Sequence, residues 1–372
     1  MKYILTGGTG FLGSLLGEEL LRLGHEVIFL GRSRNDVLYE ERQKSILLAI
    51  NRDVRLEKAS FLESDFHKKN LGLGEESIGT LRGSDGFFHL AADLSFLKRD
   101  KERVFMANLD SLAHITALCG LLNIPLLYTS TAYVHGVQKN GTLTKEELYE
   151  KPKRFNNFYE ESKYVAEKYI SEWGERSGSR FLIFRPSIIV DRENKTSTPY
   201  GIYSFIIGLL KLGRSFPIVF PYVKNARLNF VPADLVVRWM IKIGTRSDLY
   251  GKTFHLVSKN PFPIRQIVNE VFRDALGMKV ISFPAPRLVV YGWIYFLHLA
   301  SFIIPRLRNI TERTLVYNFY LSTYVLYDTS NTVLGTGDDL KKLTKCDDGY
   351  LTLITKHFVS RYQARKARSQ KS

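Results

Sequence analysis

Three glycines near the N-terminus constrain the fold more than any other feature of this sequence. They separate a short apolar segment, residues 2–6, from residues 12–23, where leucine recurs at helical spacing, and a second apolar run follows at 25–30. This order predicts a strand, a tight turn, a helix and a second strand. The glycines, spaced three apart, are Gly7, Gly10 and Gly13. Such a turn lets the backbone approach a pyrophosphate, which the free N–H groups of the helix start can bind, so the unit predicts a dinucleotide site. The alternative is a structural glycine turn that binds no ligand.

The residues after the second strand bear on which dinucleotide is bound. NAD-binding sites usually have Asp or Glu here, because the carboxylate holds the ribose hydroxyls. This sequence has Arg32 and Arg34 instead, with no carboxylate between residues 30 and 34. A guanidinium would pair with a 2′-phosphate. NADP(H) is therefore favoured over NAD(H), with Arg32 as the main contact. The alternative is that both arginines are solvated loop residues.

Strands and helices continue to alternate as far as residue 190, which predicts an α/β domain with an open, doubly wound parallel sheet. Asp65 follows one strand, and its carboxylate could accept from the adenine amine or simply form a turn. The strand that begins at Gly86 leads into small residues, and the strand that begins at Pro125 ends in hydroxyls. A helix opens at Ala107. Ligands of an open parallel sheet bind at the carboxyl ends of its strands, so these segments are expected to meet at one site.

Tyr159 and Lys163 lie four residues apart in a stretch with helical character, which places both side chains on one face. A phenol with a pKa near ~10 is a poor acid–base group at neutral pH, and a cation one helical turn away favours the phenolate. Many such pairs are solvated helix faces. After a nucleotide turn and a hydroxyl-tipped strand, a catalytic pair is the favoured interpretation.

Together these motifs resemble the extended short-chain dehydrogenase/reductase family, also known as the NAD-dependent epimerase/dehydratase superfamily, over about residues 1–270. The resemblance rests on the segments 6–13, 89–92, 129–136, Tyr159 with Lys163, and 184–186. It implies a Rossmann fold with a smaller, mostly helical C-terminal substrate lobe. It also implies a catalytic set. The family's catalytic hydroxyl lies five residues before the closing glycine of its motif, here Gly136, which gives Thr131, and the neighbouring Ser130 is less favoured. The set is Thr131, Tyr159, Lys163 and Asn108.

The predicted cofactor contacts come from the glycine turn, from the strand ends and from the catalytic set. They are Gly7, Thr9, Gly10, Phe11, Leu12, Gly13, Arg32, Arg34, Asp65, Phe66, Leu90, Ala91, Ala92, Asn108, Tyr159, Lys163, Pro186, Ser187 and Ile188.

Within the family the sequence is most similar to the thioester reductase and fatty acyl-CoA reductase branch, which has the male-sterility type of NAD-binding domain. The supporting residues are the Gly-Phe-Leu-Gly motif at 10–13, Arg32, Arg42, and the segments 70–73, 94–96 and 130–134. Two positions depart from the family pattern. Asp191 replaces a glycine, so the substrate-side loop from Arg192 is expected to differ. Asp110-Ser111 replaces Gly-Thr, which puts little in doubt.

The pattern divides the chain into an NADP-binding Rossmann domain, a substrate lobe and a tail. The domain spans 1–192, with 226–258 expected to return to it, and the lobe spans 193–345. The basic tail spans 346–372, and from Lys356 onward it has six Lys or Arg and no Asp or Glu. A solvated, frayed terminus is the favoured interpretation of this tail.

Residues 288–304 are seventeen uncharged residues, flanked by Arg287, Arg306 and Arg308. The run is short for a membrane span, and Gly292 and His298 weaken that hypothesis. Three alternatives remain: a transmembrane helix, an interfacial helix or acyl-binding cover, and a buried core helix. The favoured hypothesis is a helix beside the substrate cleft that contributes to membrane association or acyl recognition.

The function implied by the resemblance is reduction of an acyl thioester, carried by coenzyme A or an acyl carrier protein, to an aldehyde or alcohol with NADPH. The first alternative is an NADP-dependent ketone or alcohol oxidoreductase that acts on a steroid-like lipid or a sugar nucleotide. The second is a non-catalytic NADP-binding scaffold, against which the intact Thr131, Tyr159 and Lys163 set argues.

A net charge of +16 suits nucleic acid, anionic lipid or an acidic protein. No nucleic-acid module or zinc spacing is recognisable, so neither nucleic acid nor a metal is expected. An acidic acyl carrier protein remains a candidate partner. Cys119 and Cys346 cannot form a disulfide framework, and the N-terminus shows no signal peptide. A cytoplasmic protein is expected, with peripheral membrane contact through 288–304 as an option.

Overall fold

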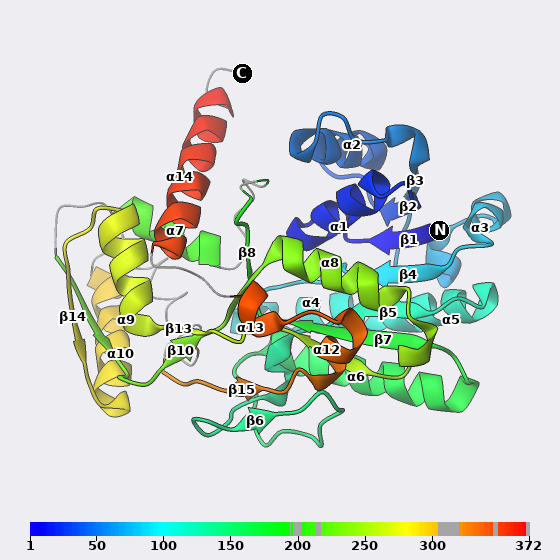
Figure 1. Cartoon of the computed structure of the whole chain (residues 1–372). Coiled ribbons are helices and arrows are strands. Elements are labelled where there is room, and N and C mark those ends of the chain that lie inside the picture. The colour runs from blue at the N-terminus through cyan, green and yellow to red at the C-terminus, as the bar shows by residue number, and fades with distance from the viewer. Residues whose placement is uncertain are drawn as a thin grey trace.

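A seven-stranded parallel sheet forms the centre of the molecule (Figure 1). The computed structural model describes residues 1–193, 195, 202–212, 217–303, 320, 322–344 and 349–369. The strand order is β12-β7-β5-β4-β1-β2-β3, and every neighbouring pair is parallel. The strands are β1 (Lys2–Thr6), β2 (Glu26–Gly31), β3 (Ala59–Glu63), β4 (Gly86–His89), β5 (Leu126–Thr129), β7 (Phe181–Pro186) and β12 (Thr253–Leu256). The predicted Rossmann-type, doubly wound sheet is confirmed.

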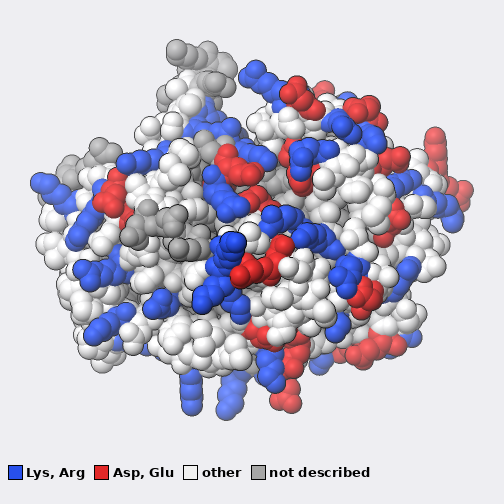
Figure 2. All heavy atoms as spheres, in the orientation of Figure 1, with Lys and Arg blue, Asp and Glu red and all other residues white. Residues whose placement is uncertain are grey.

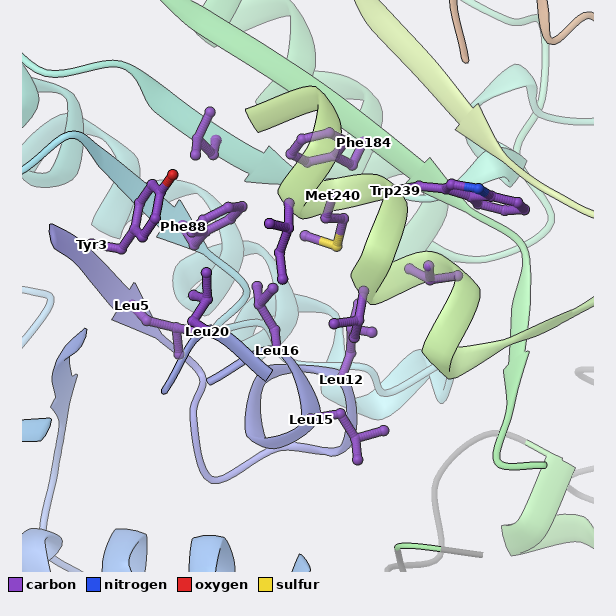
Figure 3. Packing of buried hydrophobic residues seen from close by; sticks show 14 of the residues in the cluster. Tyr3, Leu5, Leu12, Leu15, Leu16, Leu20, Phe88, Phe184, Trp239 and Met240 are labelled. Carbon is purple, nitrogen blue, oxygen red and sulfur yellow. The ribbon is translucent and has the colours of Figure 1, made fainter. Parts of the chain in front are cut away.

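Alternate residues of β1 face opposite sides of the sheet, and each side is covered by helices. Tyr3 and Leu5 pack with α1 (Phe11–Arg22), α2 (Tyr39–Ile50) and α8 (Ala233–Gly244), as Figure 3 shows for part of this cluster. On the other side, Ile4 packs with residues of three further helices. These are α3 (Glu75–Leu81), α5 (Ser111–Leu122) and α6 (Phe158–Ser177). Because successive side chains of a strand point to opposite faces and both faces are buried here, nearly every residue of the strand must be apolar.

The helix expected to open at Ala107 begins earlier in the chain. It starts with α4 (Lys101–Phe105), widens into a π-turn, η4 (Met106–Asp110), and continues as α5. The span Lys101–Leu122 is the one helix among the described residues that is long and apolar enough to cross a membrane. Its α5 part packs on the central sheet through the buried residues Leu112, Ile115, Leu118 and Cys119, as a core helix does.

The C-terminal lobe packs beside the carboxyl edge of the sheet and has its own core (Figure 1). The lobe comprises residues 202–222, 262–303, 320 and 349–369, within the described parts of those ranges. Its elements are α7 (Ile202–Leu212), β9 (Ile218–Tyr222), β13 (Phe262–Pro263), α9 (Ile264–Ile267), η7 (Val268–Ala275), β14 (Val280–Pro284), α10 (Arg287–Ile303) and α14 (Tyr350–Ser369). One short ladder, β10 (Arg227–Leu228) with β13, connects the lobe to the sheet domain. A second ladder pairs β8 (Ile188–Val190) with β11 (Phe230–Pro232).

Residues 322–344 pack on the Rossmann domain, although the sequence assigned them to the lobe. β15 (Leu326–Tyr327) pairs with β6 (Leu143–Thr144), and α12 (Ser330–Thr336) packs on α8 and β12. Glu146 is buried and accepts from the backbone N–H of His255 and from the Thr332 hydroxyl, at 2.6 and 2.5 Å. Burial raises the pKa of this carboxyl to about 7, and its hydrogen bonds act in the opposite direction. This contact has no local sequence signal, because its partners lie more than a hundred residues away.

The prediction of a frayed C-terminus is wrong for residues 350–369, which form α14. Leu351, Ile354 and Phe358 are buried in the core of the lobe. At the helix start, Glu270 accepts from the backbone N–H of Leu351 at 2.8 Å, so a distant carboxylate caps the helix. The apolar residues at helical spacing explain the docking. Cys346 lies outside the described residues.

Candidate active site

The turn between β1 and α1 is shaped by its glycines. Gly7 has a φ of +77°, and a Cβ atom on it would lie 2.7 Å from the backbone of Leu90 and Ala91. A Cβ on Gly13 would lie 2.2 Å from the carbonyl oxygen of Gly7. No side chain caps α1, whose N-cap residue is Gly10. The first N–H groups of the helix are therefore available to an anion, as a pyrophosphate requires. Thr9, Phe11 and Leu12 complete this segment, with Thr9 and Phe11 partly exposed.

A buried residue of α2 that was not among the predicted contacts supports this turn. Gln43 on α2 is fully buried and donates from Nε2 to the carbonyl oxygen of Gly8 at 3.0 Å. Its Oε1 accepts from the hydroxyl of Tyr39 at 3.2 Å. A Cβ on Gly8 would lie 2.6 Å from that Oε1 atom. The side chains of Gln43 and Phe29 therefore leave little room for a Cβ atom at Gly8.

The end of β4 closes the other side of the turn. The ring of His89 is hydrogen-bonded through Nδ1 to the Thr6 hydroxyl at 2.7 Å, and burial lowers the pKa of His89 to about 3. Leu90, Ala91 and Ala92 are partly exposed beside Gly7. Their small or backbone surfaces leave the turn open, as expected for residues beside a dinucleotide.

Arg32 and Arg34 are exposed immediately after β2. Arg42 of α2 donates to the carbonyl oxygen of Arg32 at 2.8 Å, so it fixes the backbone at this point. A carboxylate is nevertheless close by, contributed by β3 rather than by β2. Glu63 accepts from the backbone N–H and from the hydroxyl of Ser33, both at 2.6 Å. Local sequence could not reveal this carboxylate, because it reaches the site from the neighbouring strand.

Asp65 is exposed and forms the turn that was one of its two interpretations. Its Oδ1 accepts from the backbone N–H of His67 at 3.1 Å, and this bond lowers the pKa of the carboxyl. Lys68 lies 3.7 Å from Oδ2. Phe66 is partly buried against the core under α3. An adenine contact from Asp65 remains a prediction.

Tyr159 and Lys163 lie in the first two turns of α6, at the carboxyl edge of the sheet. Among the described residues, the Tyr159 hydroxyl makes no hydrogen bond, and its ring packs against Phe96 at 5.6 Å. Burial raises the pKa of Tyr159, and the carboxylate of Glu160 adds to that shift. The phenol is thus protonated at neutral pH and able to donate to a substrate oxygen.

Lys163 is buried against β5 rather than pointing into solvent. Its Nζ donates to the carbonyl oxygen of Thr129 at 2.8 Å and to the hydroxyl of Tyr128 at 3.1 Å. Burial lowers the pKa of Lys163 to about 7, while Glu167 acts in the opposite direction. The predicted lowering of the Tyr159 pKa by Lys163 is not present in this structure, because the ammonium is held by Tyr128 and Thr129.

Three hydroxyl residues follow one another at the end of β5. Thr131 is buried, and its Oγ1 accepts from the backbone N–H of Tyr133 at 3.4 Å, so it caps the next turn, η5 (Ala132–His135). The Oγ atoms of Thr129 and Ser130 are buried without a hydrogen-bond partner among the described residues. Unsatisfied buried hydroxyls are costly unless a ligand supplies the partner. This end of β5 is therefore suited to hold a polar group.

Asn108 lies in the π-turn η4 and is hydrogen-bonded to two other segments of the site. Its Oδ1 accepts from the backbone N–H of Asp93 at 2.8 Å. Its Nδ2 donates to the Asp93 carbonyl oxygen at 3.1 Å and to the Ser162 hydroxyl at 2.9 Å. The residue joins the loop after β4 to α6, between Tyr159 and Lys163. In this structure Asn108 positions the site through other residues.

The last predicted segment, Pro186 to Ile188, continues from β7 into β8. Pro186 and Ser187 are buried and Ile188 is partly exposed, and the Ser187 hydroxyl donates to Asn229 Oδ1 at 2.7 Å. The preceding residue, Arg185, forms a fully buried ion pair with Glu167 of α6 at 2.6 Å. This pair fixes the catalytic helix to β7, and the sequence analysis did not identify Glu167.

Glu160 links the start of α6 to the C-terminal part of the chain. Its backbone N–H donates to the side chain of the N-cap residue Asn157, and its Oε2 accepts from the backbone N–H of Asn156, so the helix start is held in a way similar to a capping box. The hydroxyl of Tyr320 donates to the other carboxylate oxygen. Burial raises the pKa of Glu160 to about 7, against the effect of these hydrogen bonds.

A small cavity opens between η5 and residues 320–327. Tyr133, His135, Tyr320, Tyr324 and Tyr327 line it, with Arg227 at its exposed side. The rings of Tyr133 and Tyr320 are in edge contact at 4.8 Å. Aromatic rings with polar tips thus line this cavity.

Comparison with known proteins gives a family. The model of an NAD-binding family described as male sterility protein matches residues 5–240. A non-canonical nonribosomal peptide synthetase of Aspergillus campestris is 25% identical over 321 residues, which are 80% of this chain and 29% of that protein. A Drosophila melanogaster protein named as a fatty acyl-CoA reductase is 26% identical over 351 residues, covering 78% of this chain and 66% of its own length. The chain spans about half or less of several curated relatives, including 52% of a reductase of Synechocystis sp..

Solved structures agree in fold. The terminal R domain from the myxalamid PKS-NRPS biosynthetic pathway superposes with a TM-score of 0.79 at 25% identity, over 98% of this chain and 91% of that one. The UDP-glucuronic acid 4-epimerase from Bacillus cereus, solved with NAD, has a TM-score of 0.66 at 14% identity, with 98% of each chain covered. The second likeness shows the fold alone. The resemblance to the extended short-chain dehydrogenase/reductases and to their male-sterility branch is confirmed.

Proposed function

Since this chain belongs to the male sterility family of NAD-binding domains, within the extended short-chain dehydrogenase/reductases, we propose that it is an oxidoreductase that reduces acyl thioesters with NADPH. The observation that carries the proposal is that Lys163 of α6 donates to the Thr129 carbonyl oxygen at the carboxyl end of β5, which brings the helix of Tyr159 beside the strand end that is followed by Thr131. The full-length likeness to a terminal R domain supports the substrate class.

The residues present fit a dinucleotide. Glycine is required at positions 7 and 13, because a Cβ atom would collide with the backbone of Leu90 and Ala91 or with the Gly7 carbonyl oxygen and so distort the turn. The uncapped start of α1 and the unpaired hydroxyls of Thr129 and Ser130 offer polar partners. Arg32 and Arg34 would hold a 2′-phosphate, while Ala91 and Ala92 leave room for the ring system. When bound, the dinucleotide supplies a hydride.

The hydroxyls of Thr131 and Tyr159 would hold the thioester carbonyl oxygen by hydrogen bonds. As the carbonyl carbon receives a hydride, negative charge develops on that oxygen, and these donors stabilise it most at that moment. When the C=O bond re-forms, the C–S bond breaks and sulfur leaves as the thiolate. The organic product is then an aldehyde, which a second reduction would convert to an alcohol. Lys163 would hold the position of the ribose and Tyr159.

The carrier of the acyl group would be coenzyme A or an acyl carrier protein, both of which are anionic. The protein has a net charge of +16. Complementary charge favours encounter with such a carrier. The choice between coenzyme A and an acyl carrier protein is tested in the same assay as the acyl substrate.

The test is a panel assay with the purified full-length protein. NADPH and NADH oxidation are measured against acyl-CoAs of several chain lengths, acylated carrier protein, ketones and sugar nucleotides, and the products are identified by mass spectrometry. We expect an aldehyde or alcohol from a thioester, with NADPH preferred. Turnover of ketones alone would replace this proposal by the ketone reductase alternative, and Tyr159→Phe serves as the inactive control.

A further inference from the structure

Helix α10 has one apolar face that remains exposed among the described residues. Six large side chains on it are exposed to solvent. The exposed fraction is highest for Leu288, at 83%, and for Phe302, at 70%. The six are Leu288, Val289, Tyr295, Phe296, Leu299 and Phe302, here called the α10 face. At 100° per residue these positions fall within about 140° of the helix circumference, so they form one continuous stripe. The strand before the helix, β14, adds exposed Ile281 and Phe283.

The opposite side of α10 is firmly docked, so the exposure does not come from a loose helix. Val290 and Ile294 are buried, as is Ser301. Trp293 donates from Nε1 to the carbonyl oxygen of Val219 at 3.0 Å. The hydroxyl of Tyr291 is bonded to the Ser322 hydroxyl at 3.0 Å. These contacts fix the rotation of the helix and point the α10 face away from the lobe.

The docking bears on the three alternatives for 288–304. A bilayer-spanning helix would expose apolar side chains all round, whereas α10 has one side buried against protein. A core helix would be covered on every side, whereas about 140° of the circumference of α10 is exposed. Arg306 and Arg308, and Ile304 at the end of the run, lie outside the described residues.

The basic residues around the α10 face indicate that its partner is negatively charged. From Lys259 to Ile303 the sequence has five Lys or Arg and two Asp or Glu, and one of the two acids, Glu270, is buried as the cap of α14. Lys279 and Arg287 are exposed at the two ends of the segment that contains β14 and the start of α10. In Figure 2 the lobe, on the left, shows Lys and Arg with few acids, whereas the sheet domain shows both signs.

We propose that the α10 face rests on an anionic membrane surface, with its aromatic and leucine side chains inserted among the headgroups. An amphipathic helix with basic flanks and Tyr, Trp and Phe residues suits that interface. A second copy of this chain would bring two basic surfaces together, which the net charge of +16 disfavours. An anionic bilayer complements the same charge. The inference does not depend on which substrate the site reduces.

The test is co-sedimentation of the full-length protein with phosphatidylcholine vesicles, with and without phosphatidylglycerol. We expect binding to the anionic vesicles, weakened by high salt. The double variant Phe296→Glu/Phe302→Glu should bind at least about tenfold more weakly, because two inserted rings are lost. Leu334→Glu is the matched control, since Leu334 is 58% exposed on α12, outside the face, and it should bind as the wild type does.

Three results would overturn the proposal. They are no binding of the wild type to anionic vesicles, equal binding by the double variant, and a wild-type dimer in solution that the double variant dissociates without any vesicle binding. Leu288→Glu is the second variant if the double variant melts early. Activity on a water-soluble thioester is measured in parallel and should be unchanged in the variants. Its absence in all proteins would refute the proposed function and leave the membrane result standing.

Discussion

In the Rossmann domain the large apolar residues of β1 and α1 lie inside, between the sheet and its helices, whereas in the C-terminal lobe much of the apolar surface of α10 faces outward. Both segments look alike as sequence, because each is a leucine-rich run at helical or strand spacing. The sheet domain covers its apolar residues from both sides with consecutive helices. The lobe has a smaller core and leaves one helix on its surface.

From this difference we infer a division of roles: the sheet domain holds the candidate catalytic residues, and the lobe provides the proposed membrane-binding face. Every candidate catalytic side chain lies on the sheet domain, in elements whose positions are fixed by buried hydrogen bonds. The lobe supplies Tyr320, which reaches α6 through Glu160, and the α10 face. Substitutions in the two regions should therefore change different observables.

The largest effect is expected from Tyr159→Phe. Removal of the phenol oxygen leaves the ring and the fold in place but takes away the proton donor, so kcat should fall by roughly 10²–10⁴-fold. NADPH binding, measured by fluorescence titration, should stay near the wild-type value. Tyr169→Phe on the same helix is the control. Retention of more than about a tenth of wild-type kcat would contradict the acid–base role.

Glu167→Ala should destabilise the sheet domain strongly. The variant leaves Arg185 buried without its partner, and loss of one member of a buried ion pair costs about 3–5 kcal/mol. Urea unfolding measures this change. Glu172→Ala, which removes an exposed carboxylate 3.9 Å from Lys168 on the same helix, should cost less than about 1 kcal/mol. Equal costs for the two variants would show that the buried pair does not hold α6 to β7.

Arg32→Ala should weaken NADPH far more than NADH. A charge-assisted hydrogen bond to the 2′-phosphate contributes about 1.5–3 kcal/mol, so kcat/KM for NADPH should fall by roughly 10–100-fold. Arg34→Ala is the matched variant two positions further along. An unchanged NADPH/NADH ratio would assign cofactor choice to another group, with Glu63 of β3 as the first candidate.

The junction between the two regions should show a pH dependence. The pKa of Glu160 is about 7 in the folded protein and 4.5 for a free carboxyl, so the folded state binds this proton more tightly. The resulting stabilisation is fully present below the lower value and is lost as pH rises through the upper one. Glu160→Gln should remove this part of the slope in plots of unfolding free energy against pH. Glu161→Gln should keep it, and identical slopes for both variants would show that Glu160 is not the titrating group.

The smallest effect is expected on the lobe surface. Phe296→Ala should change the free energy of unfolding by no more than about 0.5 kcal/mol, because the ring is exposed. Leu16→Ala, on the buried side of α1, should cost about 2–5 kcal/mol. Urea unfolding of both variants checks the comparison between the regions. A large cost for Phe296→Ala would mean that this side chain packs against protein.

Most of the sheet domain could be predicted, because its signals are local. The glycine turn, the alternating strands and the Tyr159–Lys163 spacing each lie within thirty residues of sequence. Other residues of the site had no such signal. Gln43, Glu63 and Tyr320 contact the site from positions tens of residues away, and Glu167, although on α6, is identified only through its partner Arg185 on β7. Only the packing of these elements brings the groups together.

The sequence by itself determined the strand–turn–helix unit, because only glycine tolerates the positive φ of Gly7 and the close approach at Gly13. It also determined that residues 288–303 form an apolar helix. The tertiary structure decided which side of that helix is buried, where the Lys163 ammonium lies, and that α14 docks on the lobe. These outcomes depend on burial and on partners far away in the chain. Periodicity specifies which residues share a face, but only the assembled core selects the face that is covered.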